Sequence, residues 1–438
     1  MPQSPARGPG EETGRSGVTG KKQHPEIKQG PLRRLWGALG PGLITGAADD
    51  DPSGIATYSQ AGAQFGYGLG WTLFLTFPLM GAIQIIAGLI GAKTGKGLTP
   101  NIAGRLPRPV LLALVAVLIV ANTVNIAADL AAMGDAVTLI VGGNRLVFAA
   151  LFGLACLAAE ILIPYHRYAG YLKLAALVLL IYVAAALSVH VSWLEVLKGL
   201  ALPDIAFDKD MLLTVVAIFG TTISPYLFFW QASQEAEDAG LAHRAHAAVD
   251  DVLRRISFDT WTGMAFSNFI ALFIMITAAA TLHAQGVTKL DSAAQAAEAL
   301  RPIAGDLTFI LFAVGIIGTG LLAVPVLAGS AAYGVAEAFG MRGSLELPAG
   351  RALGFYGIVG AATLGGVALA ATDISPIAML FWAAVINGAA AVPIMIAMML
   401  VVSGAAKDLA LPPWIKALGW LAAVVMGLTV AALLWLSF

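Results

Sequence analysis

The stretch Ala48-Asp49-Asp50-Asp51-Pro52-Ser53-Gly54 places three consecutive carboxylates and a proline inside an otherwise apolar run that begins near Leu35. A charged side chain near mid-membrane costs about 2.5–3.5 kcal/mol or more, so its presence indicates a functional site. Pro52 lacks a backbone donor and Gly54 loosens the chain, which predicts a broken helix here. Backbone carbonyls freed inside a membrane are tolerated only where they line a cavity or bind something. Three acids beside such a break predict a cation site.

The composition is that of a polytopic membrane protein. Of 438 residues, 58% are hydrophobic and only 12% are charged, a balance that a soluble domain of this size does not need. The 25 basic and 26 acidic residues nearly cancel, which argues against a nucleic-acid partner. The single cysteine, Cys156, excludes a disulfide framework and a thiolate metal cluster. Residues 1–30 have no apolar core and are predicted to be a disordered cytoplasmic tail.

The rest of the chain, residues 31–438, is predicted to be one all-α domain embedded in the lipid bilayer. Apolar runs long enough to cross a membrane predict eleven spans. Their approximate ranges are 35–64, 69–92, 108–141, 146–164, 170–190, 211–238, 256–283, 305–339, 350–371, 374–403 and 412–436. Two surface helices are also predicted, an amphipathic one over residues 241–256 and a short one within 286–304.

The distribution of Lys and Arg predicts the orientation of the chain. With the amino terminus in the cytoplasm, twenty of these residues fall on the inner side and five on the outer side. Because inner loops of membrane proteins are rich in Lys and Arg, this asymmetry predicts a cytoplasmic amino terminus and an extracytoplasmic carboxyl terminus. The predicted location is the inner or plasma membrane of the cell.

A second interrupted span reads Phe219-Gly220-Thr221-Thr222-Ile223-Ser224-Pro225-Tyr226. It lies five spans after the first, and Pro225 again follows small polar residues. Two broken spans at matching positions predict an inverted repeat with its binding site at mid-membrane. The predicted halves are residues 31–190 and 211–403, with the eleventh helix, residues 412–436, outside both.

The residues resemble those of one transporter family. Gly40-Pro41-Gly42-Leu43-Ile44, then Asp51-Pro52, then Ala61-Gly62-Ala63-Gln64-Phe65-Gly66-Tyr67 are similar to the first span of the NRAMP (natural resistance-associated macrophage protein) divalent metal transporters. The resemblance runs from Pro31 to Phe438. It implies a LeuT-like fold, alternating access and uptake of divalent transition metals, usually with protons. It also implies a transporter without enzymatic activity or cofactor, whose metal ion is the substrate.

Several positions depart from the family motifs. The first-helix motif Asp-Pro-Gly-Asn is here Asp51-Pro52-Ser53-Gly54, and the sixth-helix motif Met-Pro-His is Ser224-Pro225-Tyr226. The third-span motif Asp-Leu-Ala-Glu becomes Asp129-Leu130-Ala131-Ala132. The family's carbonyl-donating alanine and second sixth-helix histidine correspond to Thr221 and Gln231. The remaining polar positions of the resemblance are Asn268 in the seventh span and Asn387, which replaces a glutamine, in the tenth.

The predicted metal site contains only oxygen ligands. Its candidate residues are Asp51, Asp50, Thr221, Ser224 and Asn387. Without the thioether, such a site suits hard cations, Mg²⁺ above all and Mn²⁺ as the borderline case. The site chemistry therefore resembles the NRAMP-related magnesium transporters. The alternatives are a proton-coupled importer of Mn²⁺ or Fe²⁺ and a family relative with another substrate or without transport.

Proton coupling is predicted to be dispensable, because Tyr226 and Gln231 replace histidines whose pKa suits proton relay. Asp129 either carries a proton or makes a structural polar contact. Asp50 is either an outer ligand or a proton carrier, and Asp49 either pairs with a neighbouring helix or faces a vestibule. Asn268 is grouped with these residues around the site.

Two other classes remain open from the sequence. An organic-solute symporter of the same fold would present helix amino termini to a carboxylate, which three acids would repel. A non-transporting sensor would be expected to carry a large soluble domain, and this chain ends at Phe438, directly after the last span. The sequence does not determine the oligomeric state, and a monomer is compatible with it.

Overall fold

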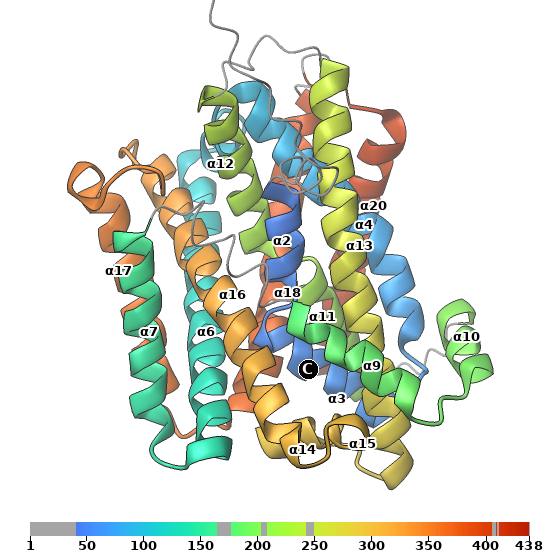
Figure 1. Ribbon diagram of the computed structural model, residues 1–438. Helices are drawn as coiled ribbons and strands as arrows, with labels where there is room; N and C mark the ends of the chain where they lie inside the picture. The colour runs from blue at the N-terminus through green and yellow to red at the C-terminus, as the bar shows by residue number, and fades with distance from the viewer. Residues whose placement is uncertain are drawn as a thin grey trace, which may run out of the picture. The chain divides into compact units, whose positions relative to one another are not determined.

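The computed structural model describes residues 41–163, 177–202, 208–241, 249–404, 409 and 411–437. Every regular element within these ranges is a helix (Figure 1). The predicted amino-terminal tail, residues 1–30, and the first part of the predicted fifth span lie outside the described residues. The predicted all-α architecture is confirmed.

Nine helical segments of the described ranges are long and apolar enough to cross a membrane. The unbroken ones are α4 (Gly70–Thr94), α6 (Arg108–Val141), α7 (Arg145–Leu162), α13 (Val249–Thr281), α16 (Thr308–Ala338), α17 (Leu353–Ala370), α18 (Pro376–Gly404) and α20 (Pro413–Ser437). The predicted first span consists of two short helices, and the described part of the fifth comprises η1 (Leu177–Leu179) and α9 (Leu180–Ser188). The count of eleven spans stays a prediction.

The two predicted breaks are present in the structure. The first span divides into α2 (Pro41–Asp49) and α3 (Pro52–Phe65), and the sixth divides into α11 (Lys209–Thr222) and α12 (Pro225–Leu241). Each second half begins at the proline that the sequence singled out. At the first turn of a helix, proline lacks only a donor that would be unpaired anyway, so it starts a new helix better than it continues an old one.

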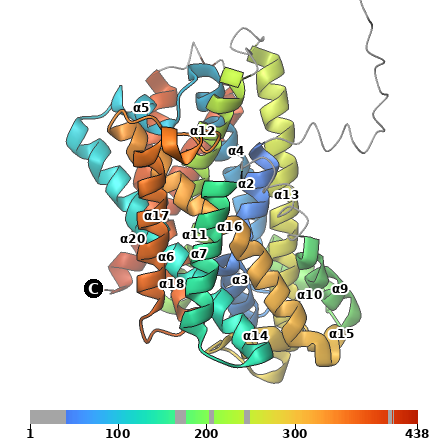
Figure 2. The same ribbon diagram turned by 60° about the vertical axis from the view of Figure 1, so that its left-hand side comes forward.

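By their contacts, the described helices fall into two groups. In Figure 2, α17 of one group lies toward the left and α13 of the other lies toward the right. Helix α13 contacts α2, α3 and α4, and α4 contacts α12, so the halves of the broken helices belong mainly to this first group. The second group is built on α6, which contacts α7, α16 and α17. Helix α18 packs against both α11 and α6. The breaks therefore lie where the two groups meet.

The outer helices expose large apolar side chains, as a lipid-facing surface requires. On α7, Leu151 and Leu154 are more than half exposed, and on α20, Leu428 is 66% exposed. A water-soluble protein rarely exposes such continuous apolar faces. Together with the nine apolar helices, these faces identify an integral membrane protein.

Two connecting segments differ from the sequence-based expectation. Of the predicted amphipathic helix over residues 241–256, residues 242–248 lie outside the described residues, and residues 249–256 form the first turns of α13. The separate helix was wrong there because Val252 and Ile256 are buried in the core and continue the face of α13. The predicted short helix within 286–304 is two helices, α14 (Ala293–Glu298) and α15 (Arg301–Ala304). Sequence reasoning did not predict α5 (Leu98–Ala103) or α10 (Trp193–Ala201).

A close approach of α11 to α18 fixes the carboxyl-terminal end of α11. A Cβ atom added at Gly220 would lie 2.0 Å from the Ala384 carbonyl oxygen and 2.4 Å from the Gly388 nitrogen. Real Cβ atoms do not approach backbone this closely. Only glycine at position 220 therefore allows the two backbones to meet here. Gly220 directly precedes Thr221, and Gly388 directly follows Asn387.

We expect Gly220→Ala to destabilise the protein by about 1–3 kcal/mol, because overpacking forces two backbones apart. The matched control is Gly357→Ala on α17, where nothing lies within 4 Å of the added atom. That control should be neutral or stabilising by about 0.5–1 kcal/mol, since alanine is the better helix former. Thermal unfolding in detergent measures both. Equal unfolding temperatures for the two variants would contradict the close approach.

Candidate metal site

The first break is built by Asp51, which acts as the N-cap of α3. Its Oδ1 accepts hydrogen bonds from the Gly54 nitrogen at 2.8 Å and from the Ser53 hydroxyl at 2.6 Å. A carboxylate at an N-cap satisfies backbone donors that the helix itself leaves unpaired. Pro52 follows at the first helical position. The motif therefore ends one helix and starts another while holding a carboxylate in a fixed orientation.

Asn125 on α6 joins this carboxylate to two other helices. Its Nδ2 donates to Asp51 Oδ2 at 2.9 Å and, more weakly, to Asp129 Oδ2 at 3.3 Å. Its Oδ1 accepts from Asn387 Nδ2 of α18 at 3.0 Å. The Asn387 Oδ1 is buried and has no hydrogen-bond partner in the described structure. Two predicted site residues, Asp51 and Asn387, are thus brought together by a residue that was not predicted.

Asp49 and Asp50 face a different helix from Asp51. The Ser267 hydroxyl of α13 lies 2.8 Å from Asp49 Oδ2 and 3.1 Å from Asp50 Oδ1. The second oxygen of each carboxyl is buried without a hydrogen-bond partner in the described structure. The helix is interrupted between Asp49 and Pro52, so Asp50 turns to α13 while Asp51, the N-cap of α3, turns to α6. All three aspartates are at most 1% exposed.

The second break consists of Ile223 and Ser224, between α11 and α12. The Ser224 hydroxyl donates to the carbonyl oxygens of Gly220 at 2.8 Å and Thr221 at 2.9 Å. It therefore satisfies carbonyls that the end of α11 leaves free. Ser224 and the Thr221 carbonyl are in contact with each other, as members of one oxygen-rich turn.

The two breaks face each other. The Thr221 hydroxyl lies 3.4 Å from the Ser53 hydroxyl, and the Tyr226 hydroxyl donates to the Ala48 carbonyl oxygen at 2.9 Å. Tyr226 thus bonds the start of α12 to the end of α2. Helix-break carbonyls, hydroxyls and the Asp51 carboxylate surround one buried region.

Two further predicted residues lie at helix interfaces. Gln231 donates to the Thr260 hydroxyl of α13 at 2.9 Å and so connects α12 with α13. Asn268 follows Ser267 on α13, and its Oδ1 is buried without a hydrogen-bond partner in the described structure. Neither residue is hydrogen-bonded to Asp51 within the described part of the chain.

Sequence reasoning missed Ser53, Asn125 and Ser267 as contacts of the acids. A signal for Asn125 exists in the sequence, because Asn122, Asn125 and Asp129 recur at helical spacing on one face of α6. Ser53 and Ser267 carry no such signal. Serine inside an apolar helix is common, and only the fold shows which serines meet a carboxylate.

The chemistry of the region is that of oxygen and amide groups. Within the described residues, no three His, Cys, Asp or Glu side chains converge into a metal cage. A cation bound here would be held by one carboxylate together with hydroxyl, amide and backbone carbonyl oxygens. Such ligands suit Mg²⁺ and Mn²⁺.

A vestibule of about 520 Å³ opens beside the site, at the end of the molecule that carries α14. Its lining includes Ala56 and Gln60 of α3, Thr214 of α11 and Phe381 of α18. Ala56 is five residues from Asp51, which itself is not part of the lining. The vestibule therefore approaches the site from one side while the carboxylate stays covered.

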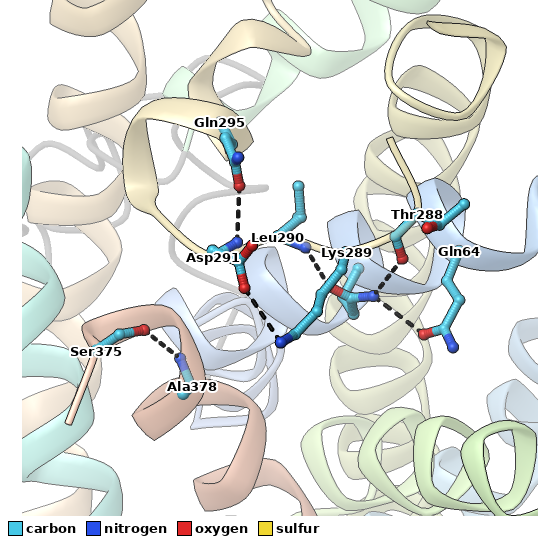
Figure 3. Close-up of polar contacts among 9 residues, drawn as sticks. Gln64, Thr288, Lys289, Leu290, Asp291, Gln295, Ser375 and Ala378 are labelled. Carbon is cyan, nitrogen blue, oxygen red and sulfur yellow. Dashed lines mark hydrogen bonds and ion pairs between the residues drawn. The ribbon is translucent and has the colours of Figure 1, made fainter. Parts of the chain in front are cut away.

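Gln60 fastens the segment that borders this vestibule. Its Nε2 donates to the Thr288 carbonyl at 3.1 Å, and its Oε1 accepts from the Leu290 nitrogen at 2.9 Å. Figure 3 shows this segment, with Lys289 and Asp291 paired at 3.3 Å. One side chain of α3 thus fixes the position of residues 288–290.

The opposite end of the molecule is closed by hydrogen bonds between α12 and α16. The Tyr333 hydroxyl donates to Glu237 at 2.8 Å and accepts from Gln234 at 3.1 Å. The Ser233 hydroxyl donates to Glu337 at 3.1 Å. These bonds connect the first helix group to the second on the side away from the vestibule. A smaller hollow of about 230 Å³ lies at this end and is lined by these same residues, Ser233, Glu237, Tyr333 and Glu337.

Comparison with known proteins identifies the family. The natural resistance-associated macrophage protein-like (Nramp) family profile matches residues 42–436. A divalent metal cation transporter, MntH, of Erwinia tasmaniensis is 30% identical over 293 residues, which cover 65% of this chain and 68% of that protein. MntH of Yersinia enterocolitica is 31% identical over 291 residues, which cover 65% of this chain and 68% of that protein.

The fold agrees with solved structures. The manganese transporter of Eremococcus coleocola superposes with a TM-score of 0.74 at 18% identity, covering 94% of this chain and 89% of that one. A nucleobase-cation-symport-1 transporter, Mhp1, superposes with a TM-score of 0.54. The predicted LeuT-like architecture, with helices interrupted at two matching positions, is confirmed. This chain belongs to the Nramp family.

Proposed function

We propose that this protein carries divalent metal cations across a cell membrane by alternating access. The observation that carries the proposal is the buried meeting of two helix breaks around Asp51, with Thr221, Ser224 and Asn387 nearby and a vestibule on one side. A charged group at mid-membrane is costly in free energy because it loses its hydration, and such groups mark functional sites. The named Nramp relatives are metal cation transporters rather than enzymes, and in this family the metal is substrate rather than cofactor.

The proposed cargo is a hard ion, Mg²⁺ or Mn²⁺. Ser224 occupies the position of the methionine in the family motif. Its hydroxyl donates hydrogen bonds to the carbonyl oxygens of Gly220 and Thr221 at the end of α11. The remaining candidate ligands are a carboxylate, an amide and carbonyl oxygens. Mg²⁺ keeps several of its waters and takes one or two carboxylates, which suits a site with a single well-placed aspartate. Asp50, turned toward Ser267, is proposed as an outer partner of the bound ion.

The proposed orientation places the vestibule on the extracytoplasmic side. The segments predicted from the sequence to be cytoplasmic carry twenty of the 25 Lys and Arg residues, whereas Lys289 in the vestibule lining belongs to the predicted outer side. Metal would reach the vestibule from outside and leave past the α12–α16 contacts. The carboxyl terminus lies outside in this arrangement.

The proposed driving force is the membrane potential. Two charges crossing 100 mV gain about 4.6 kcal/mol. That energy supports about a 2,000-fold concentration ratio at equilibrium, so protons are not required. The positions of both family histidines are occupied by Tyr226 and Gln231, and each is engaged in a hydrogen bond to a neighbouring helix.

The second candidate is proton-coupled transport, and one observation favours it. Asp129 is fully buried and is linked to Asp51 through a single residue, Asn125. Glu160 on α7 is 6% exposed, and neither of its carboxyl oxygens has a hydrogen-bond partner in the described structure. Buried carboxyls without cationic partners are suited to hold protons. The experiment on coupling below separates the two candidates.

We expect Asp51→Ala to lower metal uptake by about tenfold or more, because opposite charges in contact attract by about 1–4 kcal/mol and 1.4 kcal/mol corresponds to tenfold in affinity. The matched control is Asp135→Ala, which removes a partly exposed carboxylate further along α6. Uptake of Mg²⁺ and Mn²⁺ into proteoliposomes measures both variants. Wild-type uptake in Asp51→Ala would remove this residue from the site.

We expect Ser224→Met to strengthen binding of Mn²⁺ and Cd²⁺ relative to Mg²⁺, because a thioether is a soft ligand that late transition metals prefer. Ser224→Ala is the control, since it loses the hydroxyl without adding sulfur. Calorimetry with the three ions gives the affinity ratios. An unchanged ratio in Ser224→Met would show that this side chain does not reach the ion.

We expect metal uptake to proceed without proton movement when the potential is clamped. A pH-sensitive dye inside proteoliposomes should report no acidification on addition of Mg²⁺ or Mn²⁺ outside. Metal-dependent acidification that disappears in Asp129→Asn would establish the coupled alternative instead.

A further inference from the structure

The two oxygens of Asp51 are not equally available to an ion. A carboxylate has about four lone-pair positions, two on each oxygen. Both lone-pair positions of Oδ1 accept hydrogen bonds, one from the Ser53 hydroxyl at 2.6 Å and one from the Gly54 nitrogen at 2.8 Å. On Oδ2, one is used, by Asn125 Nδ2 at 2.9 Å. A single position remains, and it is on Oδ2.

Among the donors to Asp51 Oδ1, the Ser53 hydroxyl is the one that a side-chain substitution can remove. The Gly54 donor is a backbone N–H that no substitution to another L-residue except proline removes. Asn125 occupies the oxygen that still has room. The Ser53 hydroxyl is the donor to Oδ1 that a side-chain substitution removes while the backbone donors of Ser53 and Gly54 stay, and Ser53 is fully buried, so water does not replace the hydroxyl freely.

We propose that Ser53 is a specificity-determining residue that makes Asp51 a one-oxygen ligand and thereby favours Mg²⁺ and Mn²⁺ over Ca²⁺. The inference rests on the proposed function, since it names the selectivity of the same site. It goes beyond that function by assigning discrimination among hard cations to a side chain that does not itself touch the ion.

The physical reason is that Ca²⁺ and Mg²⁺ differ in the number and geometry of the oxygen ligands that they require. Ca²⁺ takes about 6–8 oxygen ligands at longer distances and often binds a carboxylate through both oxygens. Mg²⁺ requires about six ligands in near-ideal octahedral geometry, keeps several waters and accepts one oxygen from each carboxylate. A carboxylate restricted to one oxygen therefore costs Ca²⁺ a ligand that Mg²⁺ does not need.

The test compares two substitutions that each remove one donor from Asp51 but from different oxygens. Ser53→Ala opens a position on Oδ1 and leaves one on Oδ2, so two-oxygen binding becomes available. Asn125→Leu opens a second position on Oδ2 while Oδ1 stays saturated. Ser53→Gly removes the same hydroxyl as Ser53→Ala and serves as a second variant if alanine disturbs the start of α3.

Calorimetry on the purified full-length protein in detergent measures the affinities for Mg²⁺, Mn²⁺ and Ca²⁺. In Ser53→Ala and Ser53→Gly, we expect the affinity for Ca²⁺ relative to Mg²⁺ to rise by about tenfold, the scale of one hydrogen bond to a charged group. In Asn125→Leu, we expect all affinities to change together and the ratio to stay within about twofold of wild type. A purely structural role of Ser53 would weaken all ions equally.

The outcomes separate this inference from the proposed function. If the wild-type protein binds Mg²⁺ or Mn²⁺ and the Ser53 variants keep its Ca²⁺ to Mg²⁺ ratio, the role of Ser53 is wrong while the proposed function stands. A ratio that rises equally in Asn125→Leu also contradicts it, because the effect would not depend on Oδ1. If the wild-type protein binds neither Mg²⁺ nor Mn²⁺, the hard-ion function itself is wrong.

Discussion

The Asp51 carboxylate is buried, so hydrogen-bond donors of the protein must replace the water that would otherwise solvate it. Much of the site is arranged around this constraint. Burying a charged oxygen without donors costs several kcal/mol, so each of its donors stabilises the break as well as the charge. Two donors come from its own helix start, and the third comes from α6. The same group therefore caps α3 and fastens the first helix group to the second. A break without the acid would leave backbone donors unpaired, and the acid without the break would lack the donors of its own helix start.

The other two acids show that proximity in sequence does not make a shared site. Asp49 and Asp50 share one serine hydroxyl on α13, which has a single proton to donate. Within the described residues, the ion pairs involve other carboxylates, and none includes these aspartates or Asp129. A buried carboxylate normally has a charged or strongly donating partner. An arriving divalent cation would supply charge that the surrounding side chains do not.

The breaks, the fold class and the place of Asp51 at the first break could be predicted from the sequence because each leaves a local trace. Pro52 and Pro225 interrupt apolar runs at matching positions, and an aspartate inside such a run is costly enough to be conspicuous. The contacts of the acids left no comparable trace. Asn125 is 74 residues from Asp51, and Ser267 is 218 residues from Asp49, so only packing of distant helices brings these groups together. The helix over residues 241–256 was wrong in its described part for a related reason. A charged, alternating pattern describes the surface of the first turns of α13 as well as it describes a separate helix.

Helix α12 connects the site with the end of the molecule opposite the vestibule. At its first turn, Tyr226 bonds to the end of α2, and about 12 Å further along the helix, at 1.5 Å per residue, Gln234 bonds to Tyr333 of α16. A helix is stiff over this distance, so a displacement that separates Gln234 and Glu237 from Tyr333 also moves Tyr226 relative to Ala48. The α12–α16 contacts and the contact between the two breaks are therefore mechanically linked through one helix. The outer segment at residues 288–290 depends instead on Gln60 of α3. Each end is thus fastened by the second half of one broken span, the vestibule end by α3 and the opposite end by α12.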